Sequence, residues 1–284
     1  MDTPGTLDAL LRDLRDRLQT AGIETPGLEA RILLGTATGL DTAQLIAHGT
    51  DPATAEQAAR ADTLCQRRCA GEPMAHILGR RSFWTLELGV SPACLIPRPE
   101  TELLVEQALL AIDTLATDTP RVLDLGTGPG TIILALKSER PRIQAFASDR
   151  SHAALQQAQT NARELGLPVG LWQGDWLGAL AATVGLDVIT CNPPYIDPDD
   201  PHLTRGDLRF EPRSALAADA HGLADLHRVI DTAHAHLNRG GWLLLEHGFD
   251  QGPAVRDRLQ QAGYQSIRTL RDPAGHERTT LGMR

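Results

Sequence analysis

Residues 122–130 of this chain are VLDLGTGPG, and this stretch decides the fold. The apolar run at 122–125 has the pattern of a buried strand, and three glycines at alternate positions follow it directly. A helical pattern then begins at about Thr131. Glycines permit a tight turn and let a ligand approach the backbone closely. The stretch therefore predicts a strand, a turn that binds a nucleoside-bearing cofactor, and a helix.

The same alternation of strands and helices continues through the rest of the chain. Further apolar runs of strand length occupy residues 143–148, 169–172, 186–191 and 242–246. Two final runs, at 264–270 and 278–283, are joined by Asp-Pro-Ala-Gly and predict an antiparallel hairpin. We therefore expect an α/β fold with a mostly parallel seven-stranded sheet covered by helices and ending in this C-terminal hairpin.

The first 73 residues lack this alternation and predict a small all-α bundle. Leucines recur at helical spacing behind Thr6, a residue type that caps helices. Asp41 and Gln44 form the pattern of a capping box at the start of another helix, and a further helix is predicted over residues 54–70. No residue of the bundle points to chemistry. We interpret residues 1–73 as a packing or partner-docking module.

The bundle and the sheet are separated by a segment of different character. Residues 74–95 consist of short mixed apolar runs interrupted by glycine and proline, which predicts a β-hairpin linker. Two prolines then stiffen residues 96–99 ahead of a helix. The sheet and its cofactor site belong to a second domain, residues 96–284.

Composition argues against several classes of protein. A formal net charge of -9 over 284 residues is unfavourable for a protein whose main affinity is for nucleic-acid phosphate. The cysteines show no paired framework, which favours a reducing, cytoplasmic setting. Cys65 and Cys69, four apart on a predicted helix, could share a metal, but no nearby His or Cys completes a ligand set, so we expect no metal. The acidic residues 1–4 and the amphipathic stretch behind them predict no signal peptide, and no apolar run approaches the roughly 20 residues of a membrane span. The four cysteines are Cys65, Cys69, Cys94 and Cys191.

The glycine turn favours one class of cofactor. Its spacing is G-x-G-x-G, and Thr131 stands where a dinucleotide-binding turn has its third glycine, which counts against NAD. No lysine follows the glycines, so the turn is not a phosphate-binding P-loop. Asp149 closes the next strand, where a carboxylate accepts from ribose hydroxyls; the alternative role is a cap for the helix that begins at Ser151. Together these features favour S-adenosylmethionine.

Two more residues are candidates near this cofactor. Trp176 follows the third strand, where an indole ring can stack on adenine; packing in the core is the alternative. Asp124 lies further back on its own strand. We expect it to bond N–H groups of the glycine turn or the amino-acid tail of the cofactor.

Asn192-Pro193-Pro194-Tyr195 directly follows the predicted strand at 186–191. Proline has no N–H, and the residue before a proline is held in extended geometry, so hydrogen-bond acceptors here point outward. An amide oxygen, backbone carbonyls and an aromatic ring can together hold a planar NH2 group. By itself the motif fits a nucleic-acid base or a side-chain amide, and an ordinary strand-ending turn is the remaining alternative.

The glycine turn, Asp149 and Asn192-Pro193-Pro194-Tyr195, in this order on successive strands, resemble methyltransferases that act on amide or exocyclic amino nitrogens. Longer segments resemble the peptide chain release factor glutamine methyltransferase family, and the likeness spans nearly the whole chain. These segments are EPMAHILG at 72–79, LIPRPETE at 95–102, Tyr195-Ile196, RFEP at 209–212 and LEHG at 245–248.

The resemblance implies a Rossmann-like class I methyltransferase with residues 96–284 as catalytic domain and residues 1–73 as the module that docks a release factor. The reaction would transfer a methyl group from S-adenosyl-L-methionine to the N5 nitrogen of the glutamine in the Gly-Gly-Gln loop of class I release factors. The enzyme would be a cytoplasmic monomer that needs no metal, membrane or nucleic acid. Matching positions place the cofactor on Gly126, Thr127, Gly128, Pro129, Gly130, Asp149, Trp176 and Asn192, and the substrate glutamine on Asn192, Pro193, Pro194 and Tyr195.

Geometry must supply the catalysis, because an amide nitrogen is a poor nucleophile and the motif holds no general base. We expect the Asn192 side-chain oxygen and the Pro193 carbonyl each to accept one amide hydrogen, and the Tyr195 face to stabilise the charge that develops on nitrogen. A ribosomal protein glutamine remains an alternative substrate, and an adenine amino group of DNA or RNA a further one. Roles for four neighbouring charged residues stay open: Arg98, Glu100, Arg209 and Glu211.

Overall fold

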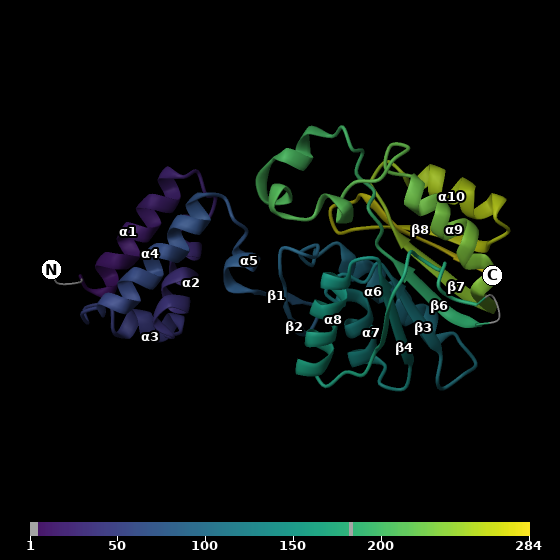
Figure 1. The fold of residues 1–284 in the computed structure, drawn as a ribbon, viewed down its shortest axis with the longest axis horizontal. Helices are drawn as coiled ribbons and strands as arrows, with labels where there is room; N and C mark the ends of the chain where they lie inside the picture. The colour runs from purple at the N-terminus through teal and green to yellow at the C-terminus, as the bar shows by residue number, and fades with distance from the viewer. Residues whose placement is uncertain (1–4, 182–183) are drawn as a thin grey trace. The chain divides into compact units, whose positions relative to one another are not determined.

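The computed structural model describes residues 5–181 and 184–284 (Figure 1). Residues 1–4 and 182–183 lie outside this description, so the expectation of no signal peptide falls in part on residues that it does not cover. The chain divides into two compact units, Met1–Gly79 and Arg80–Arg284. Among the described residues, none of the helices combines the length and the apolar character needed to cross a bilayer.

The first unit is helical throughout its described part. Two of its helix starts are those that the sequence predicts: Thr6 Oγ1 accepts from the N–H of Ala9, and Asp41 and Gln44 complete a reciprocal capping box. The apolar faces of the longer helices enclose a core of their own. The helices are α1 (Leu7–Thr20), α2 (Pro26–Thr38), α3 (Thr42–Ala47), α4 (Ala55–Cys69) and α5 (Met74–Leu78).

The segment expected to be a hairpin linker, residues 74–95, begins as helix instead. Pro73 fixes a backbone φ that suits a helix start, and Gly79 ends α5 in the left-handed region at φ 68°. The hairpin follows, with β1 (Arg80–Phe83) antiparallel to β2 (Leu86–Gly89). It belongs to the second compact unit.

The second unit is built on a seven-stranded sheet, as the sequence predicts. The strand order is β5-β4-β3-β6-β7-β9-β8, and neighbours from β5 to β7 pair in parallel. β9 lies between β7 and β8 and runs antiparallel to both, which is the predicted C-terminal hairpin. The strands are β3 (Arg121–Leu125), β4 (Gln144–Asp149), β5 (Gly170–Gln173), β6 (Leu186–Cys191), β7 (Leu237–Glu246), β8 (Gln265–Arg271) and β9 (Glu277–Met283).

Helices cover both faces of the sheet (Figure 1). Successive side chains of a strand point to opposite faces, and β3 shows the result. Val122 packs in one core with residues of α6 and α7, whereas Leu123 packs in a second core with residues of α9 and α10. Both side chains are fully buried, which locks the start of the glycine turn in place. The helices are α6 (Thr101–Asp113), α7 (Thr131–Glu139), α8 (His152–Glu164), α9 (Ala224–His236) and α10 (Gly252–Gln261).

Between β6 and α9 the chain forms three short 3-10 helices that the sequence did not predict. One side chain from elsewhere and one from within hold this segment: the guanidinium of Arg150 donates to the carbonyl of Ser214 at 2.7 Å, and Arg213 donates to the carbonyl of Pro198 at 2.6 Å. The segment brings residues 212–215 to the carboxyl edge of the sheet. The 3-10 helices are η1 (Pro201–Thr204), η2 (Gly206–Phe210) and η3 (Arg213–Ala215).

Candidate active site

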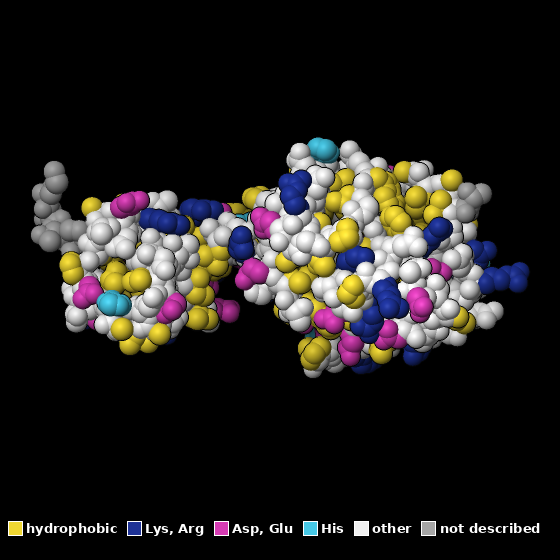
Figure 2. Space-filling model, turned by 90° about the horizontal axis from the view of Figure 1, so that it is seen from below, with side chains coloured by type: hydrophobic (Ala, Val, Ile, Leu, Met, Phe, Trp, Pro, Cys, Tyr) yellow, Lys and Arg dark blue, Asp and Glu magenta, His cyan; other side chains and the backbone are white. Residues whose placement is uncertain are grey.

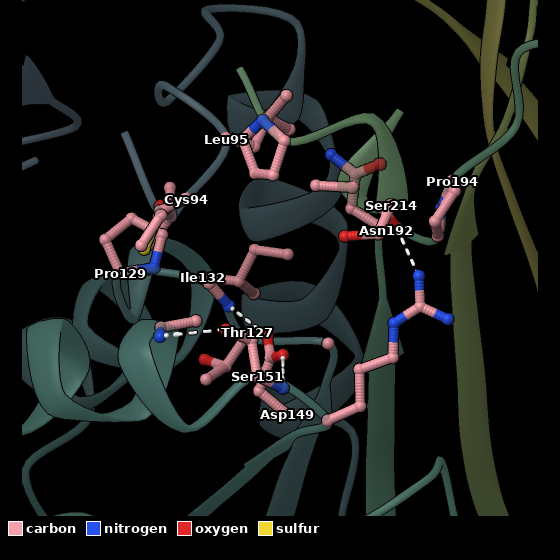
Figure 3. A pocket seen from close by; sticks show the side chains of 18 of the residues that line it. Cys94, Leu95, Thr127, Pro129, Ile132, Asp149, Ser151, Asn192, Pro194 and Ser214 are labelled. Carbon is pink, nitrogen blue, oxygen red and sulfur yellow. Dashed lines mark hydrogen bonds between the residues drawn. The ribbon is translucent and has the colours of Figure 1, made fainter. Parts of the chain in front are cut away.

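A cavity opens where β3, β4 and β6 end (Figure 3). Parallel strands present their carboxyl ends at one edge, so the segments that follow them line one crevice. Asp149 lies in the lower part of Figure 3, and Asn192 and Pro194 lie at the upper right. The cavity therefore brings the predicted cofactor residues and the substrate motif together. Of the predicted site residues, all of which the structure describes, it is lined by Gly126, Thr127, Gly128, Pro129, Asp149, Trp176, Asn192 and Pro194, and not by Gly130, Pro193 or Tyr195.

The glycine turn adopts the backbone that its sequence predicts. Gly126, Gly128 and Gly130 have φ of 66°, 56° and 88°, a region that favours glycine. A Cβ atom on Gly130 would stand 2.8 Å from Cδ1 of Leu134, so the third glycine lets α7 pack closely behind the turn. Gly128, by contrast, faces the cavity.

Asp149 connects the glycine turn to the start of α8. Its Oδ2 accepts from the N–H of Gly128 at 2.9 Å, and its Oδ1 accepts from the N–H of Ser151 at 2.8 Å. Ser151, not Asp149, caps α8, because the Ser151 hydroxyl accepts from the N–H of Ala154. Each Asp149 oxygen keeps acceptor capacity toward the cavity. A role in binding ribose hydroxyls stays a prediction that this geometry permits.

Asp124 differs from its sequence-based expectation. Its side chain is fully buried and accepts from the hydroxyls of Thr127, at 2.7 Å, and Thr190, at 2.8 Å. Asp124 and its chain neighbours are all described, and Asp124 does not line the cavity. Burial raises the pKa of Asp124 to about 7. Asp124 therefore holds the turn from behind through Thr127 rather than bonding the cofactor tail.

Trp176 packs against a core and also lines the cavity, so core packing is confirmed and stacking on adenine stays a prediction. Its indole Nε1 donates to Oδ1 of Asp225 at 3.1 Å, and its ring packs against Gly126, where an added Cβ would be 3.2 Å away. The ring also lines the cavity. Its backbone has a φ of 53°, which is uncommon for a bulky residue and is stabilised by these contacts. A cofactor ring beside Gly126 would therefore meet the indole.

The Asn192-Pro193-Pro194-Tyr195 motif follows β6, as predicted. The Asn192 side chain donates from Nδ2 to Oγ1 of Thr101 at 3.2 Å. The Tyr195 hydroxyl donates to Oε1 of Glu246 at 3.3 Å, and burial together with that carboxyl raises the pKa of Tyr195. Thr101 and Glu246 are partners of the motif that reasoning from the sequence missed, since neither is near it in the chain.

Asn161 is another residue that the sequence did not single out. It is 1% exposed, and its Nδ2 donates to the carbonyls of Pro129, at 2.8 Å, and Gly89, at 2.9 Å. Its Oδ1 accepts from the N–H of Gly89 at 2.9 Å. One amide therefore ties the end of the β1–β2 hairpin to the glycine turn. An asparagine inside α8 carries no local sign of this role.

Arg98 and Glu211 form the pair whose role the sequence left open. Their side chains are ion-paired, and Oε2 of Glu211 also accepts from the N–H of Ile96 at 2.9 Å. The Glu211 side chain has no exposed surface, and burial raises its pKa against the opposing effect of Arg98. Arg98 itself lines the cavity. The pair clamps residues 96–98 to the 3-10 segment. Of the other two charged residues, Arg209 stacks on Phe210, and Glu100 immediately precedes α6.

In the sheet, β9 is inserted antiparallel between β7 and β8, and an acid at the end of the strand after the glycine turn faces that turn. These two features define a Rossmann-like methyltransferase. Two family models match the chain: the PrmC N-terminal domain over residues 9–79 and the methyltransferase small domain over residues 101–205. The release factor glutamine methyltransferase of Salmonella typhimurium is 47% identical over 283 residues, which are 99% of each chain. This chain belongs to the release factor glutamine methyltransferase family.

A further relative agrees with the family, and solved structures agree with the fold. The release factor glutamine methyltransferase of Escherichia coli is 48% identical over 273 residues, 96% of each chain. The solved structure of a Pyrococcus furiosus methyltransferase matches 77% of this chain and 95% of its own, with a TM-score of 0.51 at 19% identity. A Thermus thermophilus 16S rRNA N2 G1207 methyltransferase with AdoMet and guanosine covers 72% of this chain and 49% of its own, also with a TM-score of 0.51 and 19% identity. At such identities the structures attest the fold alone.

Proposed function

We propose that this enzyme transfers a methyl group from S-adenosyl-L-methionine to the N5 side-chain nitrogen of the glutamine in the Gly-Gly-Gln loop of class I peptide chain release factors. One observation carries the proposal. Asn192, an amide at the end of β6, lines the same cavity as the glycine turn and Asp149. A methyl donor on the turn and an amide acceptor beside Asn192 would therefore meet in one crevice.

The residues of the cavity fit this cofactor. Gly128 has no side chain to fill the cavity, Asp149 offers carboxylate oxygens, and Trp176 offers a ring face. S-adenosylmethionine, when bound, supplies a methyl group on a positively charged sulfur. The turn would hold its amino-acid end, Asp149 its ribose hydroxyls and Trp176 its adenine. The full set that we assign to the cofactor is Gly126, Thr127, Gly128, Pro129, Gly130, Asp149, Trp176 and Asn192.

The substrate amide is held by acceptors rather than activated by a base. Asn192 Oδ1 and the Pro193 carbonyl would each accept one hydrogen of the glutamine NH2 group, which aims the nitrogen lone pair at the methyl group. As positive charge develops on nitrogen, these oxygens and the Tyr195 ring stabilise it. Pro194 lines the cavity and narrows it around the amide. Proton loss from nitrogen follows the transfer.

The same acceptors select glutamine over glutamate. A carboxylate brings no hydrogens, so both acceptors would stay unpaired and desolvated, at a cost of about 1–3 kcal/mol each. A Gly-Gly-Glu release factor should therefore be neither methylated on nitrogen nor bound as well at this site.

We assign docking of the release factor to the helical unit that precedes the catalytic unit. Its core is closed, yet it exposes large apolar side chains: Leu28 is 57% exposed and Ile32 38% on α2, and Ile46 is 75% exposed on α3. Figure 2 shows apolar side chains among charged ones on this unit. A face of this kind suits a protein partner. Leu28→Asp should raise the KM for an intact release factor and leave methylation of a short Gly-Gly-Gln peptide unchanged.

A labelling experiment tests the activity itself. The purified protein is incubated with labelled S-adenosylmethionine and, in separate reactions, with a class I release factor, total ribosomal protein, or DNA and RNA. Label on the Gly-Gly-Gln peptide of the release factor supports the proposal. Label confined to ribosomal protein would move the substrate to another glutamine, and label confined to nucleic acid would overturn the assignment. The same preparation, run on a sizing column, tests our expectation of a monomer.

A further inference from the structure

A short chain of neighbouring polar groups lies behind Asn192. Asn192 Nδ2 donates to Oγ1 of Thr101, a residue of α6 that is 3% exposed. The Thr101 hydroxyl also acts on the carboxyl of Glu246, whose pKa it lowers. Glu246 is 1% exposed at the end of β7 and accepts from the Tyr195 hydroxyl through Oε1. Asn192, Thr101, Glu246 and Tyr195 thus follow one another, with hydrogen bonds formed between Asn192 and Thr101 and between Tyr195 and Glu246.

The direction of this chain determines what Asn192 presents to the cavity. An asparagine amide has a donating and an accepting end, and a hydroxyl can both accept and donate. If Thr101 gives its hydrogen to Glu246, its oxygen must accept from Asn192 Nδ2. Asn192 Oδ1 is then turned away from Thr101 and toward the cavity. If Thr101 gave its hydrogen to Asn192 instead, the NH2 group of Asn192 would face the substrate.

Glu246 is placed to set that direction. Its Oε1 accepts from Tyr195, and its Oε2 is buried without a hydrogen-bond partner among the described residues. A buried acceptor without a partner is costly, so this oxygen favours taking the Thr101 hydrogen.

We propose that Glu246 is a positioning residue which, by accepting the Thr101 hydrogen, fixes the Asn192 amide with its oxygen toward the substrate and so sets the preference for glutamine over glutamate. The inference rests on the proposed function, because it explains how that site reads an amide. Neither Thr101 nor Glu246 needs to touch the reacting nitrogen for this effect.

The charge state of Glu246 gives a second consequence. Burial raises the pKa of Glu246 to about 7, while Arg278, Thr101 and Tyr195 oppose the shift and Glu100 adds to it. The ionised carboxylate only accepts hydrogen bonds, whereas the protonated carboxyl can donate to Thr101 and reverse the chain. Activity should therefore rise with pH through about 7. Cys191, at the end of β6, also interacts electrostatically with Glu246, but burial raises the pKa of the Cys191 thiol well above its usual value, so Cys191 does not titrate near pH 7.

The test compares four variants with the parental enzyme on two release factors, one with glutamine and one with glutamate in the Gly-Gly-Gln loop. Thr101→Val removes the hydroxyl at constant shape, Thr101→Ser restores it, and Glu246→Gln introduces a donor at constant size. Thr232→Val, on an exposed face of α9, is the matched control. The measurements are kcat, KM, the inhibition constant of the glutamate form, and the dissociation constant of S-adenosylmethionine.

For Thr101→Val and Glu246→Gln we expect kcat to fall about 10-fold and discrimination against the glutamate form to fall by a similar factor, as for loss of one buried hydrogen bond. Cofactor affinity should stay within about twofold, and Glu246→Gln should also lose the pH-dependent limb near 7. Thr101→Ser should restore discrimination, and Thr232→Val should match the parent.

The experiment distinguishes failure of the proposed function from failure of the role of Glu246. A parental enzyme that leaves the release factor unlabelled refutes the proposed function. A parental enzyme that labels it, with unchanged discrimination in Thr101→Val and Glu246→Gln, refutes only the role of Glu246. A lower kcat in which discrimination and the pH profile are kept would also refute that role, because a purely structural effect gives this result.

Discussion

The two halves of the cavity are assembled from very different lengths of chain. The cofactor half comes from one strand-turn-helix unit and the next strand, so that residues 126–130 and Asp149 are brought together by adjacent elements. The substrate half joins Asn192, directly after β6, to Thr101, 91 residues earlier, and Tyr195 to Glu246, 51 residues later. The first half is determined locally, and the second exists only once the sheet is complete.

This difference predicts how each half responds to mutation. Hydrogen bonds from the next strand and helix hold the glycine turn, so a change there should affect mainly cofactor binding. The substrate half depends on long-range buried partners, so a change there should also affect stability or the direction of hydrogen bonds.

The largest effect should follow from removing the clamp between residues 96–98 and the 3-10 segment. Glu211→Ala leaves Arg98 and the N–H of Ile96 without their buried acceptor, and we expect a loss of about 3 kcal/mol in the free energy of unfolding. Denaturant unfolding measures it. Asp113→Ala, which breaks an exposed pair with Arg140, is the control and should cost less than about 1 kcal/mol. Equal losses in the two variants would contradict the clamp.

The second effect is a pH dependence of stability in the substrate half. The folded protein holds the Glu246 proton up to about pH 7, whereas the unfolded chain releases it near 4.5, so stability from this group is lost as pH rises between these values. Stability relative to Glu246→Gln should fall by up to about 3 kcal/mol over this window. Asp124, whose pKa is also raised to about 7, is common to both proteins and cancels. A difference between the two proteins that is flat from pH 4.5 to 7 would count against the buried carboxyl.

The third prediction separates chemistry from cofactor binding. Asn192→Ala removes a substrate acceptor, and kcat should fall on the order of 10²-fold, by analogy with loss of an oxyanion donor. Asn238→Ala, at an exposed amide bonded to Asp187, is the matched control and should keep the parental rate. Single-turnover methylation measures both. Methylation by Asn192→Ala at the parental rate would remove Asn192 from the mechanism.

The smallest effect should appear in the cofactor half alone. Asp149→Ala removes acceptors for the ribose hydroxyls, and the affinity for S-adenosylmethionine should fall about 10-fold, as for loss of one charge-assisted hydrogen bond. Titration calorimetry measures it, with Asp231→Ala at an exposed ion pair as control. Unchanged affinity in Asp149→Ala would refute the ribose role. Stability should change less than in Glu211→Ala, because Asp149 bonds only neighbouring backbone groups.

Helix caps and turns were predicted well, because they depend on backbone preferences and hydrogen bonds within a few residues. Thr6 caps α1, Asp41 and Gln44 form a capping box, and the glycines of the turn take positive φ, all as the sequence predicts. The same holds for the seven strands, whose apolar runs must be buried. The expected start of the hairpin at residue 74 was wrong, since Pro73 and Gly79 mark the ends of a short helix.

Side chains with distant partners escaped prediction. Asn161, Thr101 and Glu246 carry no local sign of their partners, and Asp124 was expected to bond N–H groups of the turn or the cofactor tail, whereas it accepts from two hydroxyls, one of them in the turn. A buried polar group is explained only by the groups that the fold places against it. Those groups depend on strand order and helix packing, which bring together segments from across the chain.

The sequence by itself determined the elements of this protein: a strand that runs into a glycine turn, an acid at the end of the next strand, and an amide followed by two prolines and a tyrosine. Backbone preferences and apolar periodicity act over a few residues, so these features could be predicted from the chain. Only the tertiary structure decided which way the Asn192 amide faces and what holds residues 96–98 against Glu211. Both depend on buried hydrogen bonds whose partners meet only when α6, β6 and β7 have packed.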